Sequence, residues 1–322
     1  MFAMRGIAVS FSVFFVVYGA LSALVCGLWR RIKIWLASRQ LSTQRTADLL
    51  FGLRVVPFLL ATGVTLALAV PSFLLLEPRS VDEPMSPVPV ALALCGMAML
   101  LVGAYKAVTS WVRASQAIAR WSSNARTQSR ALDSTSSITV MQMMGVAPPL
   151  AAAGIMRSSV WLSQAAEFVL TEQELQSALR HEIVHVRRRD NLRKLVLRLV
   201  VFPGMAKLES DWRAATEMAA DDAAVSSASE ALDLAAAVIK LSRLAPLALS
   251  GDLTTALVNS PAEFLNARVE RLIAWTETGQ TPPREHWFVY TSCAAAAMVV
   301  TLALTYSELL IRVHAATEWL VR

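Results

Sequence analysis

Charged residues are scarce in this chain of 322 residues: Asp, Glu, Lys and Arg together make up 17% of it, whereas 55% is hydrophobic. Cysteine is scarcer still, and all three cysteines lie inside apolar runs, so the chain needs neither disulfides nor a thiolate metal site. These proportions exclude a disordered chain, a collagen and a disulfide-rich secreted domain. With a mean hydropathy of +0.49, the composition indicates an integral membrane protein.

Long uncharged runs are abundant in the sequence. A helix of about 20 apolar residues can span the hydrocarbon core of a bilayer, because its backbone polar groups are paired internally. Four runs predict transmembrane helices at residues 7–29, 55–76, 88–105 and 287–307. The first run is longer than the apolar region of a usual signal peptide and has no small-residue cleavage site, so we interpret it as an anchor.

The basic residues predict the orientation, since Lys and Arg near span ends are retained in the cytoplasm. Residues 30–54 hold six basic residues and one acid, whereas residues 77–87 hold one basic residue and three acids. Residues 106–286 hold 20 more, so 26 of the 30 basic residues share one side if the spans alternate. A bacterial-type inner or plasma membrane with both termini outside follows. The net charge of +6 then reflects topology, and no direct nucleic-acid partner is expected.

Three regions follow from this topology: three spans within residues 1–110, a cytoplasmic domain at 111–286, and the fourth span with a short outside tail at 287–322. After the third span we expect a helix and a polar linker up to residue 136. Residues 137–141 and 159–163 have strand patterns. Thr171 and Glu174 form a capping box that predicts a helix start, and a second helix start is predicted at 260–263. The fold class is therefore a mainly α integral membrane protein with a cytoplasmic α+β domain.

The pentapeptide HEIVH at residues 181–185 lies on the first of these helices. His181 and His185 are four residues apart, so both imidazoles lie on one helix face and can reach a single metal ion. Glu182 is adjacent. This is the zincin arrangement, in which two histidines bind Zn²⁺ and the carboxylate takes a proton from the attacking water. The motif predicts Zn²⁺ as cofactor, His181 and His185 as ligands, and Glu182 as the catalytic base.

A catalytic zinc site with one open position needs a third protein ligand, commonly a carboxylate. Glu217, 36 residues after His181, lies in an Ala-rich stretch that favours a helix. We predict Glu217 as the third metal ligand. Asp221, one turn further on, is predicted to accept the outward N–H of a ligating histidine and so to orient it. Asp222 is expected on the solvated face of the same helix.

Together, the runs HEIVHVRRRDN at 181–191 and EMAADDA at 217–223 resemble the membrane metallopeptidases of the BlaR/MecR antirepressor family. The resemblance covers about residues 1–310. It implies four spans around a cytoplasmic zincin-like metallopeptidase domain and a basic helical element at 266–272. It also implies a protein substrate, either a transcriptional repressor or the protease itself. The β-lactam sensors of that family carry a penicillin-binding domain after the last span, whereas this sequence ends at Arg322, so a separate sensor subunit is a further expected partner.

Three features have alternative interpretations. The basic residues between Arg187 and Arg198 alternate with apolar ones, which fits either a solvated face or an interfacial helix on anionic headgroups. The strand at 159–163 is either structural or an edge that pairs with an extended substrate. His286 and His314 flank the fourth expected span and are given no metal role.

The leading hypothesis is an integral-membrane zinc endopeptidase that performs regulatory proteolysis on the cytoplasmic side. Two alternatives stay open. One is a membrane quality-control protease of the HtpX type, whose family usually places spans between the histidine motif and the third ligand. The other is a catalytically silent membrane signalling adaptor, against which the intact set of metal and base residues argues.

Overall fold

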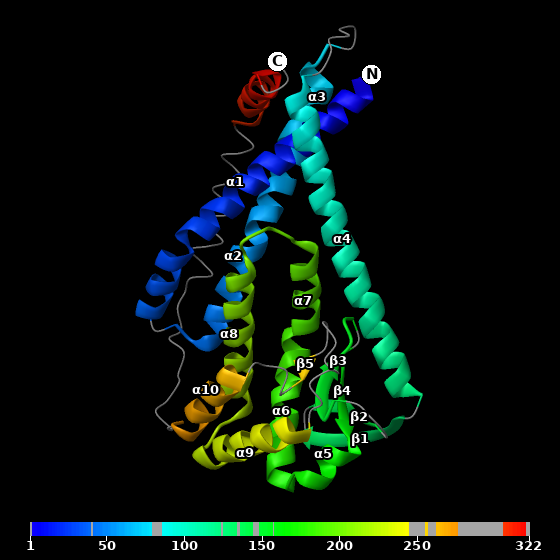
Figure 1. Cartoon of the computed structure of the whole chain (residues 1–322), viewed down its shortest axis with the longest axis vertical. Coiled ribbons are helices and arrows are strands. Elements are labelled where there is room, and N and C mark those ends of the chain that lie inside the picture. Colours follow the sequence, from blue (N-terminus) through cyan, green and yellow to red (C-terminus); the bar gives the residue numbers. More distant parts are fainter. Residues whose placement is uncertain are drawn as a thin grey trace.

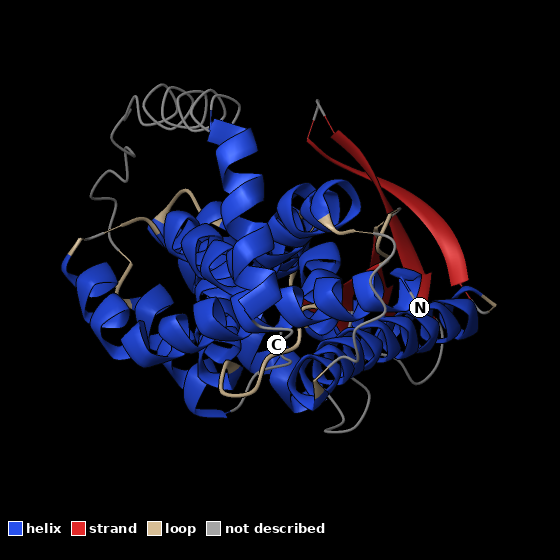
Figure 2. Cartoon of the chain, turned by 90° about the horizontal axis from the view of Figure 1, so that it is seen from above, coloured by secondary structure: helices blue, strands red, loops and turns tan. Residues whose placement is uncertain are grey.

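The computed structural model describes residues 2–39, 41–78, 86–123, 125–133, 136–143, 148–156, 158–244, 255–256, 262–275 and 305–319. Helices dominate these residues (Figure 1), and Figure 2 shows that the strands gather at one side of the helices. The expected mainly α class is therefore observed.

Three long helical segments contain the first three apolar runs. They are α1 (Phe2–Ser38), α2 (Thr43–Val64) continued through the π-helical turn η1 (Thr65–Ala69) into α3 (Val70–Leu76), and α4 (Pro87–Ser122). Each contains an 18-residue window with a mean hydropathy of 2.1 or 2.2, and at most 28% of that window is buried inside the chain. The three segments are thus long and apolar enough to cross a membrane, with most of their apolar surface facing outward.

Each helix extends beyond the apolar run that predicted it. In particular, α4 continues without interruption past residue 110, where the first region was expected to end. The polar linker expected after this helix is wrong over residues 125–133, which form a strand paired with the next one along the chain.

The fourth expected span at 287–307 lies outside the described residues apart from 305–307, and His286 lies outside them too. Residues 305–319 are helical. The Tyr306 hydroxyl of this helix donates a hydrogen bond of 2.7 Å to the backbone oxygen of Ala67 in η1. The helix is therefore joined to the α2–α3 segment.

Among the described residues, the sheet has five strands in the order β1-β2-β4-β3-β5, and only the β2–β4 pair is parallel. They are β1 (Ala125–Asp133), β2 (Ser136–Met143), β3 (Leu150–Ala153), β4 (Ser159–Ser163) and β5 (Thr255–Ala256). The two predicted strands fall in β2 and β4. Because β4 lies between β2 and β3, both of its edges are occupied, and the prediction that it could pair with a substrate is wrong.

In the described part of residues 164–273 the chain forms six further helices. They are α5 (Gln164–Val169), α6 (Glu172–Arg188), α7 (Asp190–Leu199), α8 (Ala206–Ala224), α9 (Ala228–Leu244) and α10 (Ala262–Ile273). The main core lies between the sheet, α6, α9 and α10, where Leu162, Leu179, Val238 and Leu272 are at most 2% exposed. Burial of each such side chain contributes about 1.5–3 kcal/mol, so this core fixes α6 on the sheet.

The segment between α7 and α8 reaches the long apolar helices, α7 contacts α4 and α8 contacts α2 (Figure 1). A Cβ atom on Gly103 of α4 would lie 2.1 Å from the backbone oxygen of Leu199, so only glycine allows this close approach. The Tyr18 hydroxyl of α1 donates a hydrogen bond of 2.9 Å to the backbone oxygen of Val201. On α8, Trp212 is 1% exposed in an apolar cluster that includes Leu50 of α2. Helices α7 and α8 are therefore both anchored to the apolar segments.

Candidate metal centre

Helix α6 carries the pentapeptide, and its ends are fixed by local interactions. The predicted capping box is observed: Glu174 N donates to the Thr171 hydroxyl and Thr171 N donates to the Glu174 carboxylate. At the other end Arg189 adopts a left-handed conformation with φ of 53°, which ends α6 and turns the chain into α7. The capping box, which the sequence contains, therefore fixes where the helix that carries the pentapeptide begins. The left-handed conformation of Arg189 fixes where it ends.

His181, His185 and Glu217 converge within the described residues, with ligand atoms all within 4.8 Å of one another. The two Nε2 atoms are 3.1 Å apart, and oxygens of Glu217 lie 3.5 Å from Nε2 of His181 and 3.7 Å from Nε2 of His185. Ligands at 2.0–2.2 Å from a tetrahedral Zn²⁺ ion are separated from each other by about 3.3–3.6 Å. The three side chains therefore fit one zinc ion, and they come from α6 and α8.

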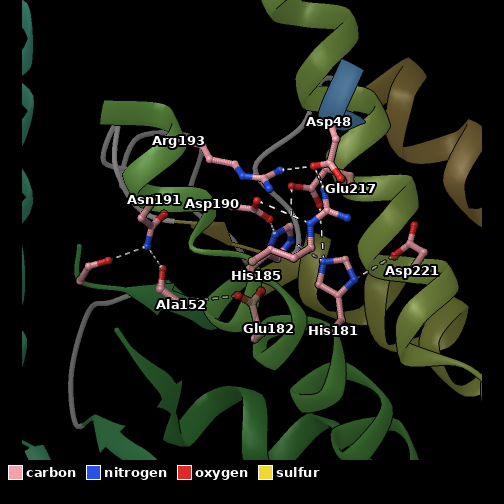
Figure 3. A network of polar contacts seen from close by, with 12 residues as sticks. Asp48, Ala152, His181, Glu182, His185, Asp190, Asn191, Arg193, Glu217 and Asp221 are labelled. Atoms are coloured by element: carbon pink, nitrogen blue, oxygen red, sulfur yellow. Dashed lines mark hydrogen bonds and ion pairs between the residues drawn. The ribbon is translucent and has the colours of Figure 1, made fainter. Parts of the chain in front are cut away.

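Each histidine of this cluster has a carboxylate beside its other ring nitrogen (Figure 3). Nδ1 of His181 lies 3.0 Å from Oδ1 of Asp221, although the angle is outside that of an aligned hydrogen bond. Nδ1 of His185 lies 2.7 Å from Oδ2 of Asp190. A carboxylate at Nδ1 favours the tautomer with the proton there, which leaves Nε2 available to bind a metal.

The sequence predicted the position of Asp221 but missed the role of Asp190. Asp190 is the first residue of α7, directly after the left-handed turn at Arg189, and it is fully buried. This turn brings its carboxylate back toward the end of α6. The available signal was an acidic residue five positions after His185, just beyond the end of the motif helix.

A buried arginine makes contacts that the sequence analysis did not predict, although the basic helical element implied at 266–272 contains it. Arg268 of α10 is 1% exposed, and its Nε and Nη2 atoms donate to Asp221 at 2.8 Å and 2.7 Å. Its Nη1 atom lies 3.1 Å from Oε2 of Glu217. Arg268 therefore holds the carboxylates of Glu217 and Asp221 in place. The available signal was its position between Leu265 and Leu272, on the apolar face of its helix.

The charges of this cluster shift the pKa values of its members. Burial alone would lower the pKa of His185, but the carboxylates of Glu217 and Asp190 outweigh it and raise this pKa to about 10. Burial opposes ionisation of Glu217, yet His185 and Arg268 hold its pKa well below the ordinary value. In the same way Arg268 lowers the pKa of Asp221 to about 2 against the effect of burial. Ionised carboxylates thus attract positive charge to the two imidazoles, which is the electrostatic environment of a cation site.

Glu182 lies between the metal cluster and strand β3 (Figure 3). It is fully buried, and its Oε2 atom accepts a hydrogen bond of 2.8 Å from the backbone nitrogen of Ala152. Burial raises the pKa of Glu182, while His185 and His181 partly oppose the rise. The Asn191 amide donates to the backbone oxygens of Ala152 and Gly154, both at 3.1 Å. Asn191 therefore fixes β3 beside the carboxylate of Glu182.

Helix α2 makes polar contacts with α6, α7 and α8, the helices that carry the residues of the centre. Asp48 of α2 lies 2.6 Å from Nη1 of Arg193 and 3.8 Å from Nη2 of Arg188. These two arginines of the basic stretch therefore face a carboxylate of the chain itself. Asp222 was expected on a solvated face, and this is wrong: its carboxylate accepts a hydrogen bond of 2.7 Å from the Thr43 hydroxyl and pairs with Arg271 at 2.7 Å. Such contacts connect the α8 helix to α2 and α10.

Comparison with known proteins adds no family name. No model of a protein family matches the chain, and no curated protein matches its sequence. The argument for function therefore depends on the geometry and chemistry of the centre.

Proposed function

We propose that the protein is an integral-membrane zinc endopeptidase that hydrolyses a peptide bond on the cytoplasmic side. One observation carries this proposal: His181, His185 and Glu217 converge at metal-ligand spacing, and each imidazole has a carboxylate at its Nδ1 atom. The basic residues that flank the apolar helices support a cytoplasmic location of the centre.

The residues of the centre suit hydrolysis of a peptide bond. Zn²⁺ held by His181, His185 and Glu217 would polarise the substrate carbonyl and lower the pKa of water to about 7. Glu182 would accept the proton of the attacking water and then donate it to the leaving amine. Burial raises the pKa of Glu182 above its ordinary value, which is the direction that favours its return of the proton to the leaving amine. Asp221 and Asp190 would keep the imidazoles oriented.

Two alternatives remain distinguishable from this proposal. An HtpX-type protease would have spans between the histidine motif and the third ligand, but α7 has ten residues, or about 15 Å of helix, which is half of a bilayer core. Regulatory proteolysis, of a repressor-like protein or of the chain itself, predicts few cleaved proteins, whereas quality control predicts many. A catalytically silent adaptor predicts that a variant without the catalytic base, such as Glu182→Gln, has the same phenotype as the parent chain.

The experiment compares the parent chain with Glu182→Gln in the native membrane, by sequencing protein N-termini and measuring zinc content. We expect Glu182→Gln to keep its zinc and to reduce cleavage by at least about 100-fold, since general acid–base catalysis contributes about 10²–10⁴-fold. Glu172→Gln is the matched control, because Glu172 is an exposed carboxylate in the first turn of the same helix. Equal sets of N-termini for the parent chain and Glu182→Gln would refute the peptidase and leave the adaptor.

A further inference from the structure

A second cluster of metal-ligating side chains lies far from the centre on α6. Glu77, directly after α3, meets His314 and Glu318 of helix 305–319, and their ligand atoms all lie within 4.8 Å of one another. Figure 1 shows helix 305–319 (red) near the end of α3, at the opposite end of the long helices from the sheet and α6. We call these three residues the distal cluster.

The distal cluster has the donors of a zinc-type ion. One imidazole nitrogen and two carboxylates form a ligand set that Zn²⁺ and related divalent ions accept. Nε2 of His314 lies 3.5 Å from Oε1 of Glu318, one turn further along the same helix. This separation equals the spacing of ligands around one tetrahedral ion, about 3.3–3.6 Å. The two side chains are thus already placed for shared coordination.

The carboxylate of Glu77 is held in position by a cation. Nη2 of Arg5 in α1 lies 3.3 Å from Oε1 of Glu77, and both side chains are 12% exposed. This contact resembles that between Arg268 and Glu217 in the buried centre. The imidazole of His314 is 16% exposed and the carboxylate of Glu318 is 46% exposed. An ion from solution can therefore reach the distal cluster.

Independent evidence places helix 305–319 against α2 and α3. The hydrogen bond from the Tyr306 hydroxyl to Ala67 ends in the π-helical turn η1. Such turns inside α-helices are frequent at functional sites. The helix is therefore attached at one point, and a metal ion at Glu77, His314 and Glu318 would attach it at a second point about two turns away.

We propose that Glu77, His314 and Glu318 bind a divalent cation of the Zn²⁺ class, which joins helix 305–319 to α3 at the end of the apolar helices remote from the peptidase centre. This proposal gives His314 a metal role that the sequence alone did not assign to it. This inference goes beyond the proposed function, because it needs no peptidase activity. It gives the chain a metal-responsive contact of its own on the far side of the helices.

The test is the zinc content of the purified full chain in detergent, measured by mass spectrometry after dialysis against micromolar free Zn²⁺. We expect His314→Gln to bind one zinc ion per chain fewer than the parent chain, and Glu77→Gln, which changes the other helix, to show the same loss. Glu308→Gln is the matched control, because Glu308 is an exposed carboxylate of the same helix that pairs with Arg312 instead.

The expected difference does not depend on the peptidase centre. If that centre binds zinc, the parent chain should hold two zinc ions and His314→Gln one. If it does not, the parent chain should hold one zinc ion and His314→Gln none. Glu318→Gln serves as a further variant, because it changes the third ligand, whose side chain is 46% exposed, and it should show the same loss of one zinc ion. Equal zinc contents in the parent chain and in His314→Gln would overturn the proposal.

Discussion

The two clusters at opposite ends of the molecule share their ligand types but differ in what surrounds them. In the buried centre, His181 and His185 are at most 2% exposed, and each faces a carboxylate at Nδ1. In the distal cluster the donors are partly exposed, and Arg5 is the cation that holds Glu77. The buried centre takes its groups from α6, α7, α8 and α10, whereas the distal cluster takes them from two helix ends and α1.

The difference in surroundings between the two clusters shows how the residues next to a metal ligand affect metal binding. Buried ligands with fixed neighbours bind a metal without reordering, and removal of one neighbour leaves a buried charge uncompensated. Partly exposed ligands are screened by water and keep their mobility. We therefore expect the buried centre to bind zinc tightly and to be sensitive to each surrounding residue, and the distal cluster to bind zinc more weakly and exchange it faster.

The largest effect is expected for Glu217→Gln. This change removes a ligand of the buried centre and should weaken zinc binding there by more than about 100-fold, since loss of a residue that only orients a ligand costs about 10–100-fold. It should also remove the part of the zinc-dependent rise in unfolding temperature that comes from the buried centre, a stabilisation of about 2.7 kcal/mol in the parent chain at a zinc concentration of 100 times the Kd of that centre. Thermal unfolding at several zinc concentrations measures both effects.

Glu209→Gln is the control for this prediction. Glu209 lies on the same helix, but it pairs with Arg213 at 2.5 Å and is not in the cluster with the two histidines. The distal cluster should keep its zinc in Glu217→Gln. An unchanged zinc response of Glu217→Gln would remove Glu217 from the ligand set.

A smaller effect is expected for Asp190→Asn. The neutral amide cannot stabilise the Nδ1 proton of His185 as a carboxylate does, so zinc affinity at the buried centre should fall by about 10–100-fold. Competition with a chelator of known affinity measures this change. Asp211→Asn is the control, since Asp211 of α8 is a partly exposed carboxylate that pairs with Lys33. Equal losses in both variants would show that Asp190 does not act through His185.

Much of the buried centre follows from local sequence. The histidines four residues apart and the capping box of Thr171 and Glu174 both belong to one helix. They can therefore be predicted from local sequence without knowledge of any tertiary contact. Glu217 could be predicted because zinc chemistry demands a third ligand. The long apolar helices follow from composition alone, since lipid imposes the same requirement on every residue of a span.

Arg268, Asp190 and β3 could not be predicted in this way. Arg268 contacts Asp221, which lies 47 residues earlier in the chain. The sequence around an arginine on an apolar helix face does not indicate which distant carboxylate it will contact. Asp190 depends on the left-handed turn at Arg189, a conformation that arginine rarely adopts. Strand β3 has the sequence LAAA, whose alanines have low strand propensity, and pairing with β4 stabilises it.

The smallest expected effect, about tenfold per unit of pH, is a pH dependence that separates the two clusters. In the metal-free chain the pKa of His185 is about 10, above its ordinary 6.5, so its charged form stabilises the fold fully below pH 6.5 and this stabilisation is lost as pH rises through about 10. The pKa of Asp221, about 2, acts in the opposite sense: its stabilisation is present above pH 3.8 and is lost as pH falls through about 2.

Zinc must displace the proton of His185, so its apparent affinity for the buried centre should rise with pH, by about tenfold per unit for each proton released, up to about pH 10. Calorimetric titration at pH 7 in two buffers of different ionisation enthalpy measures the protons released per zinc ion. At least one proton should be released in the parent chain and equally in His314→Gln, because the distal cluster is not its source. Zinc binding that releases no proton and is unchanged between pH 7 and 9 would show that the imidazole is already neutral, and that Glu217 and Asp190 do not hold a positive charge there.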